Sequence, residues 1–180
     1  MLFQNVEMFE TDRFQYLLIH KNASSSVLKC MQNINYIVTD KVNLNKIRWT
    51  VIREPYERFI AGLKYDLKIH NLNYEDINYS TLNNARVSLA TRSQGYVNHT
   101  ASQVPYLINT NIDWYVELKD LCTFLKMHFD RVEYCNISEN DLKLNLDKKE
   151  IMKYLNLDYY VYNQIINSPN LWKWQHGKIF

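Results

Sequence analysis

Twice before residue 70, the chain passes from a short apolar run, through a few polar residues, into apolar residues at helical spacing. In the first of these units, the apolar run Tyr16–His20 leads into the small and polar residues Lys21–Ser26. The apolar residues that follow at helical spacing are Val27, Met31, Ile34 and Val38. This order predicts a buried strand, a tight loop and a helix.

The second unit repeats the order. The run Ile47–Ile52 predicts a strand that stops at Arg53, Glu54 and Pro55, and proline suits the first turn of a helix. An apolar stripe follows at Tyr56, Phe59, Ile60, Leu63 and Leu67. Strands that alternate with helices in this way indicate an α/β fold, with a mainly parallel sheet, right-handed crossovers and flanking helices.

The rest of the chain is patterned less evenly. Between Lys68 and Thr110 it is polar and weakly periodic, so we assign no element there, although loops of this kind often carry function. Beyond that stretch the pattern predicts a strand at 114–118, a helix at 118–129, a strand at 132–135, and helices at 148–155 and 159–166. With only three Gly and three Pro, the 180 residues predict a single domain that spans residues 1–180.

Composition excludes several classes of protein. The formal net charge is +2 and no run of Lys and Arg occurs, so no nucleic-acid partner is expected. The three cysteines are scattered without CxxC spacing, so neither a disulfide framework nor a metal site is predicted. The N-terminus does not resemble a signal peptide, and no stretch approaches about 18 apolar residues. We therefore expect a cytoplasmic protein without a transmembrane segment.

The abundance of Asn, Lys, Ile and Tyr is typical of an AT-rich genome such as that of a phage.

The segment Lys-Asn-Ala-Ser-Ser-Ser lies where the first predicted strand passes into its helix. A loop of small residues at this place directs backbone N–H groups into one concavity, and the helix N-terminus adds partial positive charge, so the loop can hold a phosphate or sulfate. The candidate anion-binding residues are Lys21, Asn22, Ala23, Ser24, Ser25 and Ser26. The alternative is that the serines only cap the helix. The segment does not match GxxxxGK[ST], so an ordinary nucleoside-triphosphatase loop is not indicated.

The longer segment LLIHKNASSSVLK resembles the 5′-phosphosulfate-binding loop of the sulfotransferases that use 3′-phosphoadenosine 5′-phosphosulfate (PAPS). In that family an apolar strand runs into a Pro-Lys pair followed by small and hydroxyl-bearing residues. Lys21 matches the family's Lys and Ser24–Ser26 match its hydroxyl cluster, whereas His20 stands where the family usually has Pro. The resemblance implies that Lys21 stabilises charge on the leaving oxygen.

The segment WTVIREPYERFIAG resembles the 3′-phosphate-binding segment of the same family. The resemblance implies that Arg53 contacts the 3′-phosphate, for which the planar guanidinium is well suited. Arg58 matches a second Arg of the family, with a structural or phosphate-facing role, and Ala61 stands where the family has Ser. Taken without the resemblance, the segment is equally typical of a helix that starts at proline and carries surface charges.

Sulfuryl transfer also needs a base for the acceptor proton. The stretch between the two motifs contains no His and no Glu, and Asp40 is its one carboxylate. Residues 98–103 are similar to a His-x-x-x-Gln pattern found in some carbohydrate-type members, which makes His99 our first candidate, because imidazole titrates near neutral pH. Asp40 and His70 are the alternatives, and His99 is equally compatible with a solvent-facing loop residue.

The resemblance as a whole implies a P-loop-like sulfotransferase fold and membership of the carbohydrate or Golgi-type branch. It implies an enzyme that moves the sulfuryl group of PAPS to an acceptor hydroxyl, on a glycan or another small molecule. It also suggests that Trp172, Lys173 and Trp174 touch the adenine or the 3′-phosphate, the alternative being core packing. Two other functions stay open: a kinase or other phosphoryl-transfer enzyme with a variant phosphate loop, and a non-catalytic nucleotide-binding relative.

Overall fold

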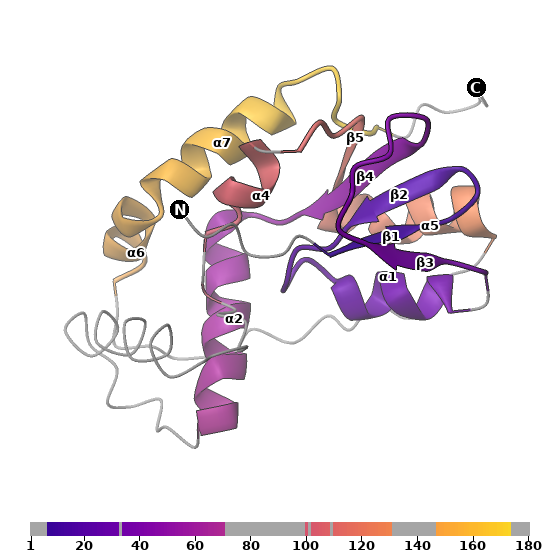
Figure 1. Cartoon of the computed structure of the whole chain (residues 1–180). Helices are drawn as coiled ribbons and strands as arrows, with labels where there is room; N and C mark the ends of the chain where they lie inside the picture. Colours follow the sequence, from indigo (N-terminus) through magenta and orange to yellow (C-terminus); the bar gives the residue numbers. More distant parts are fainter. Residues whose placement is uncertain are drawn as a thin grey trace.

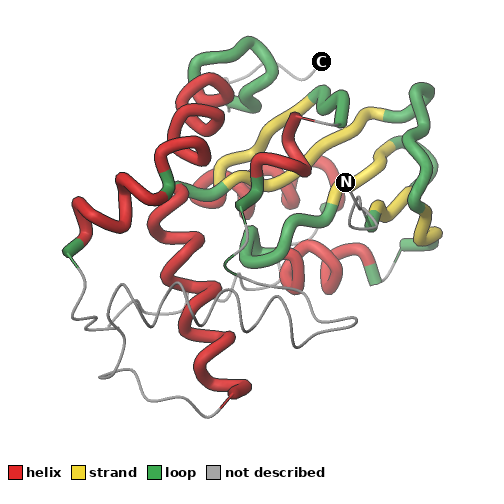
Figure 2. The backbone as a smooth tube through the Cα atoms, turned by 60° about the vertical axis from the view of Figure 1, so that its left-hand side comes forward, coloured by secondary structure: helices red, strands yellow, loops and turns green. Residues whose placement is uncertain are grey.

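The computed structural model of the chain describes residues 7–32, 34–70, 100, 102–108, 110–130 and 147–173. Figure 1 shows a sheet with helices against both faces, and Figure 2 shows the same layers from another side. The strands are β1 (Met8–Glu10), β2 (Phe14–Leu17), β3 (Ile37–Thr39), β4 (Ile47–Ile52) and β5 (Trp114–Glu117). The helices are α1 (Ser24–Met31), α2 (Pro55–His70), α4 (Val104–Ile108), the short 3₁₀ helix η2 (Leu118–Asp120), α5 (Leu121–Phe129), α6 (Lys148–Tyr154) and α7 (Asn156–Ile166). None of the described helices is both long and apolar enough to cross a membrane.

The fold is α/β, but its five-stranded sheet is mixed. The strand order is β3-β1-β2-β4-β5, in which β2, β4 and β5 run parallel while β1 is antiparallel to both β2 and β3. The prediction of a mainly parallel sheet is therefore wrong for the half of the sheet that contains β1 and β3. Each of these strands has three residues, too few to show a period, and β1 reaches β2 through a tight turn in which Thr11 N–H donates to the Phe14 carbonyl at 2.8 Å.

The helix predicted to continue through Ile34 and Val38 ends earlier, at Met31. Val38 lies instead in β3, where it pairs with Phe9 of β1. The residues of β3 are β-branched, which favours a strand. The apolar spacing that suggested a longer helix is thus shared between a helix and the strand that follows it.

Most of the other predicted elements are confirmed. The first strand begins at Phe14 and ends at Leu17, whereas β4 and the start of α2 at Pro55 lie where the pattern placed them. The predicted elements near β5, α5, α6 and α7 are present with shifted ends. The last turn of α2 and all of α4 lie in the stretch to which we assigned no element. The strand predicted at 132–135 lies outside the described residues.

The core lies on both faces of the central strands. Tyr16 and Trp49 point to the face covered by α1 and α5, whereas Leu17 and Ile52, from the same two strands, point to the face covered by α4 and α7. None of the four is more than 1% exposed. A third apolar cluster joins α2 to α6 through residues such as Phe59. Because β2 and β4 are paired and buried on both faces, the loops that leave their carboxyl ends are held next to each other.

Candidate functional site

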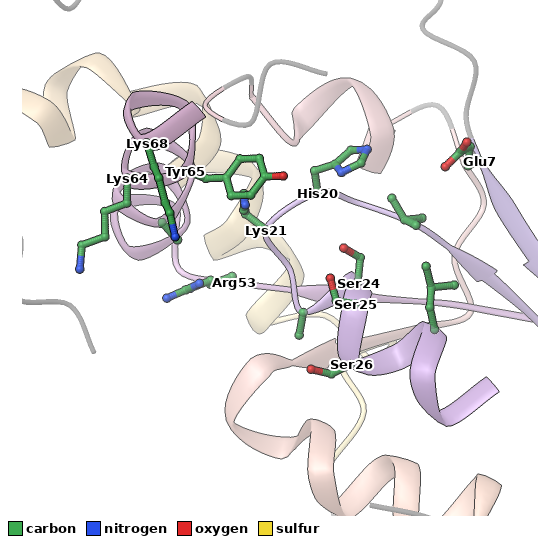
Figure 3. Close-up of a pocket in the computed structure, with 14 residues that line it drawn as sticks. Glu7, His20, Lys21, Ser24, Ser25, Ser26, Arg53, Lys64, Tyr65 and Lys68 are labelled. Carbon is green, nitrogen blue, oxygen red and sulfur yellow. The ribbon is translucent and has the colours of Figure 1, made fainter. Parts of the chain in front are cut away.

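A cleft of about 710 Å³ opens beyond the carboxyl ends of β2 and β4, where the chain turns into α1 and α2 (Figure 3). Open α/β sheets commonly bind ligands at this edge, outside the ends of parallel strands. The residues predicted from the sequence that line the cleft are Lys21, Ala23, Ser24, Ser25, Ser26 and Arg53. Residues from both sequence motifs therefore face one cavity.

The loop from β2 to α1 contains two non-glycine residues in the left-handed backbone conformation. The φ angle is 64° at Lys21 and 58° at Ala23, and such a conformation costs about 1–3 kcal/mol for a residue with a Cβ. Left-handed residues in a turn direct successive N–H groups into a concavity that suits an anion. The N–H groups of Ser24 and Ser25 begin α1, where they have no partner within the helix. The loop thus combines a strained backbone with N–H groups that have no partner within α1, both at the cleft.

The serines do not cap the helix. The N-cap of α1 is Ala23, and no side chain accepts a capping hydrogen bond there. The interpretation of the serine cluster as a simple N-cap is therefore wrong. Figure 3 shows the hydroxyls of Ser24 and Ser25 turned toward the loop that carries Lys21. Ser26 also lines the cleft but is only 6% exposed.

Asn22, which we predicted as a ligand-binding residue, uses its side chain to hold the fold. It is fully buried, and its Nδ2 donates to the Val51 carbonyl at 2.7 Å and to Gln103 Oε1 at 3.1 Å. Gln103 in turn donates from Nε2 to the Arg53 carbonyl at 3.3 Å, while its backbone N–H donates to Asp158. Two buried amides therefore fasten the β2–α1 loop to β4 and to the loop that carries Arg53.

The ammonium of Lys21 lies over an aromatic ring of α2. Lys21 Nζ is 3.3 Å from the centroid of the Tyr65 ring, within the range of a cation–π contact. Tyr65 is 44% exposed and lines the cleft. Lys21 is thus held on the α2 side of the cleft, and both it and Tyr65 belong to the lining.

Arg53 lies between the main cleft and a smaller pocket of about 180 Å³. Its side chain is 12% exposed, and its Nε lies 3.6 Å from Glu57 Oε2. Burial lowers the pKa of Arg53, and the neighbouring carboxylates of Glu57 and Glu54 only partly oppose this effect. Its guanidinium is therefore partly buried, and part of its charge is balanced from the side of the smaller pocket.

Arg58, the second arginine of the motif, is not among the residues that line the cleft. It is 4% exposed and lies near Tyr106 of α4, where burial raises the pKa of the tyrosine hydroxyl and Arg58 partly offsets that rise. Of the two roles considered for Arg58, its position favours the structural one. Ala61, which also belongs to the motif, does line the cleft.

Several lining residues were missed from the sequence. Lys64, Tyr65 and Lys68 follow Ala61 on one face of α2, and Glu7 and His20 line the opposite part of the cavity (Figure 3). The signal for the α2 residues was present, because positions three, four and seven residues after Ala61 share a helix face. Among apolar residues this spacing predicts the buried stripe of α2, and among Lys64, Tyr65 and Lys68 it predicts a second, polar face. For His20 the sequence offers only the departure from the family's proline.

The structure leaves the identity of the base unassigned. His99 lies outside the described residues, as does the side chain of His70. Asp40 is exposed after β3 and is not among the residues that line the cleft. In the described part of the chain no group of three or more His, Cys, Asp or Glu side chains is arranged to hold a metal ion.

Trp172 packs into the core and not against the cleft. Its ring meets that of Phe124 edge-on at 5.2 Å, and it adjoins the apolar cluster under α1 and α5. Lys173 is exposed and does not line the cleft, and Trp174 lies outside the described residues. For Trp172 the core-packing alternative is therefore confirmed.

Comparison of the chain with protein-family models, with curated proteins and with solved structures gave no match.

Proposed function

We propose that the chain is a PAPS-dependent sulfotransferase that places a sulfuryl group on an acceptor hydroxyl. One observation carries the proposal: Lys21, the serine cluster and Arg53, which come from two separate motifs, line the same cleft. PAPS has an anionic group at each end of its ribose, so its site needs anion-binding groups at two places. The loops after β2 and β4 offer one set each.

In this proposal the 5′-phosphosulfate lies on the loop between β2 and α1. The N–H groups of Ser24 and Ser25, at the positive end of the helix dipole, donate to the anion. The serine hydroxyls add further donors, and Lys21 lies beside the oxygen that joins phosphate to sulfate. The left-handed conformations of Lys21 and Ala23 fit this role, because backbone strain is often retained where it prepares a binding site.

The transfer itself needs an acceptor oxygen in line with the departing phosphate oxygen. A bond forms between the acceptor oxygen and sulfur as the bond between sulfur and the 5′-phosphate oxygen breaks. The products are a sulfate ester and 3′-phosphoadenosine 5′-phosphate (PAP). Lys21 neutralises the charge that develops on the phosphate oxygen. The acceptor proton goes to a general base, for which His99 stays our hypothesis, with Asp40 and His70 as alternatives.

Arg53 is proposed to meet the 3′-phosphate at the other end of the nucleotide. The parallel strands β2, β4 and β5 would then correspond to the central part of a P-loop-like sulfotransferase fold, with β1 and β3 added at one edge. The acceptor is proposed to be a glycan or another small hydroxyl compound, with neither a nucleic acid nor a metal involved.

The proposal is tested by the substitution Lys21→Ala. Purified protein is incubated with labelled PAPS and a panel of hydroxyl acceptors, and sulfate transfer and PAP release are both measured. Loss of a group that stabilises charge in the transition state should reduce turnover by about 10²- to 10³-fold. Lys29 is exposed on α1, the helix that follows the loop of Lys21, so Lys29→Ala is the matched control and should keep wild-type turnover. Circular dichroism checks that both variants are folded.

Near wild-type turnover in folded Lys21→Ala would contradict the proposed mechanism. Wild-type protein that binds PAP but transfers no sulfate to any acceptor would instead favour a non-catalytic nucleotide-binding relative. Transfer of phosphate from ATP, with no turnover of PAPS, would favour the phosphoryl-transfer alternative.

A further inference from the structure

One face of α2 forms a basic wall of the cleft. Ala61, Lys64, Tyr65 and Lys68 are spaced so that they share this face, and all four line the cavity. Lys64 is half-buried and Lys68 is exposed. With Lys21 and Arg53, they bring four cationic side chains to the described lining, in which Glu7 supplies the one carboxylate.

The two lysines lean toward Arg53. In an α-helix the Cα–Cβ bonds tilt toward the N-terminus, so the side chains of Lys64 and Lys68 extend back over the turns that contain Ala61. The N-terminus of α2 is the end next to Arg53, which precedes Pro55 by two residues. Figure 3 shows Lys64, Lys68 and Arg53 projecting toward the same end of the cleft.

Arg53 does not provide enough positive charge for a phosphate monoester. The phosphate carries about 1.5 to 2 negative charges at pH 7. Arg53 carries one positive charge, which Glu57 at 3.6 Å and the nearby Glu54 already offset in part. Ala61, which lies on the wall between Arg53 and the lysines, has no side-chain donor. A phosphate at this end of the cleft therefore needs further cations, and Lys64 and Lys68 are placed to supply them.

We propose that Lys64 and Lys68 bind the 3′-phosphate of the nucleotide together with Arg53, and so determine that the cleft selects a 3′-phosphorylated nucleotide. This proposal depends on the proposed function, because it assigns residues to one end of the same ligand. It makes the α2 face the part of the cleft that distinguishes PAP from adenosine 5′-phosphate.

Titration calorimetry with these two nucleotides tests the proposal. They differ by the 3′-phosphate alone, so the ratio of their dissociation constants measures recognition of that group. The variants are Lys68→Gln, Lys64→Gln and the double variant, with Lys126→Gln on the exposed surface of α5 as the matched control. Lys68→Gln should weaken PAP binding by about 10- to 150-fold, as expected for a hydrogen bond to a charged group, and leave adenosine 5′-phosphate binding unchanged. Lys68→Arg should restore most of the lost affinity.

Equal losses for both nucleotides, or no loss in the double variant, would overturn the assignment while leaving the proposed function in place. Wild-type protein that binds neither nucleotide would overturn the proposed function, and this inference with it. The control variant separates a local effect from the general effect of removing one positive charge.

Discussion

The contact between Lys21 and Tyr65 shows what a single residue can do for this cleft. A lysine side chain has many rotamers, and fixing it in one place costs about 1.5–2 kcal/mol. Because the Tyr65 ring holds the ammonium at 3.3 Å, part of this entropy cost arises on folding and not on ligand binding. We infer that Tyr65 is a positioning residue for Lys21, acting through its ring.

Under the proposed function, replacement of the ring should therefore reduce sulfate transfer, whereas loss of the hydroxyl should not. Cation–π contacts are worth about 0.5–2 kcal/mol, so Tyr65→Leu is expected to lower PAPS turnover by about 2- to 30-fold. Tyr65→Phe keeps the ring and should retain wild-type turnover. The measurement is the initial rate of PAP release by both variants under identical conditions. Equal losses in the Phe and Leu variants would show that the hydroxyl, and not the ring, matters.

At the same scale, the sequence predicted the residues of the cleft better than their roles. Lys21, the serines and Arg53 could be predicted because each belongs to a short segment whose chemistry is visible locally. Asn22 and Arg58 belong to the same segments, yet Asn22 is turned to Val51 and Arg58 is buried near α4. Which side of a loop or helix is buried depends on elements far along the chain, as the contact of Asn22 with Gln103 shows.

Among the elements, the strand–loop–helix units were predictable and the sheet edge was not. An apolar run followed by helical spacing leaves few alternatives, which is why β4 and α2 begin where expected. The strand β3 pairs with β1, and β1 pairs with β2, but a strand of three residues is too short for its sequence to reveal this pairing. The helix α4 has five residues and lies in a polar region, so its period was equally hidden.

The helix α5 carries a histidine in an aromatic environment. The His128 ring lies 4.6 Å from that of Phe124, 5.2 Å from Trp114 and 5.6 Å from Phe14, measured between centroids. Its Nε2 is buried without a hydrogen-bond partner in the part of the chain that the structure describes. Burial, and then the nearby charge of Arg13, lower the pKa of His128. The native state therefore favours the neutral imidazole.

This environment predicts a loss of stability on mild acidification. The unfolded chain, in which His128 has its ordinary pKa of about 6.5, takes up the proton more readily than the native state. The stabilisation is thus complete above about pH 6.5 and is lost as the pH falls through the lowered native pKa. Urea denaturation between about pH 8 and pH 5 should show a steeper fall in the free energy of unfolding for wild type than for His128→Phe. Identical slopes would show that His128 does not control this pH dependence.

For the molecule as a whole, charge is unevenly distributed. The chain has a formal net charge of only +2, yet four cationic side chains and one carboxylate line the described cleft. Because the cleft joins the loops after β2 and β4 to the face of α2, an anion bound there links parts of the fold that must separate on unfolding. Ligand binding should therefore be detectable as a change in global stability.

The expected change can be measured by thermal unfolding. PAP at about 100 times its dissociation constant should stabilise the native state by about 2.7 kcal/mol, which raises the Tm of a chain of this size by about 5–11 °C. Adenosine, which has no phosphate, should leave the Tm almost unchanged at the same concentration. Equal shifts with the two compounds would show that the cleft binds the nucleoside and not its anionic groups.

The described lining of the cleft comes from one early part of the chain, between Glu7 and Lys68. The described residues proposed to bind one ligand therefore lie in a single continuous part of the sequence, which can be inherited as a unit. Among the described residues after this segment, Gln103 accepts a hydrogen bond from the buried Asn22, and Asp158 accepts one from the Gln103 backbone. Exchange of the later segment would then leave the proposed anion-binding residues in place, provided that the buried amide of Gln103 is kept.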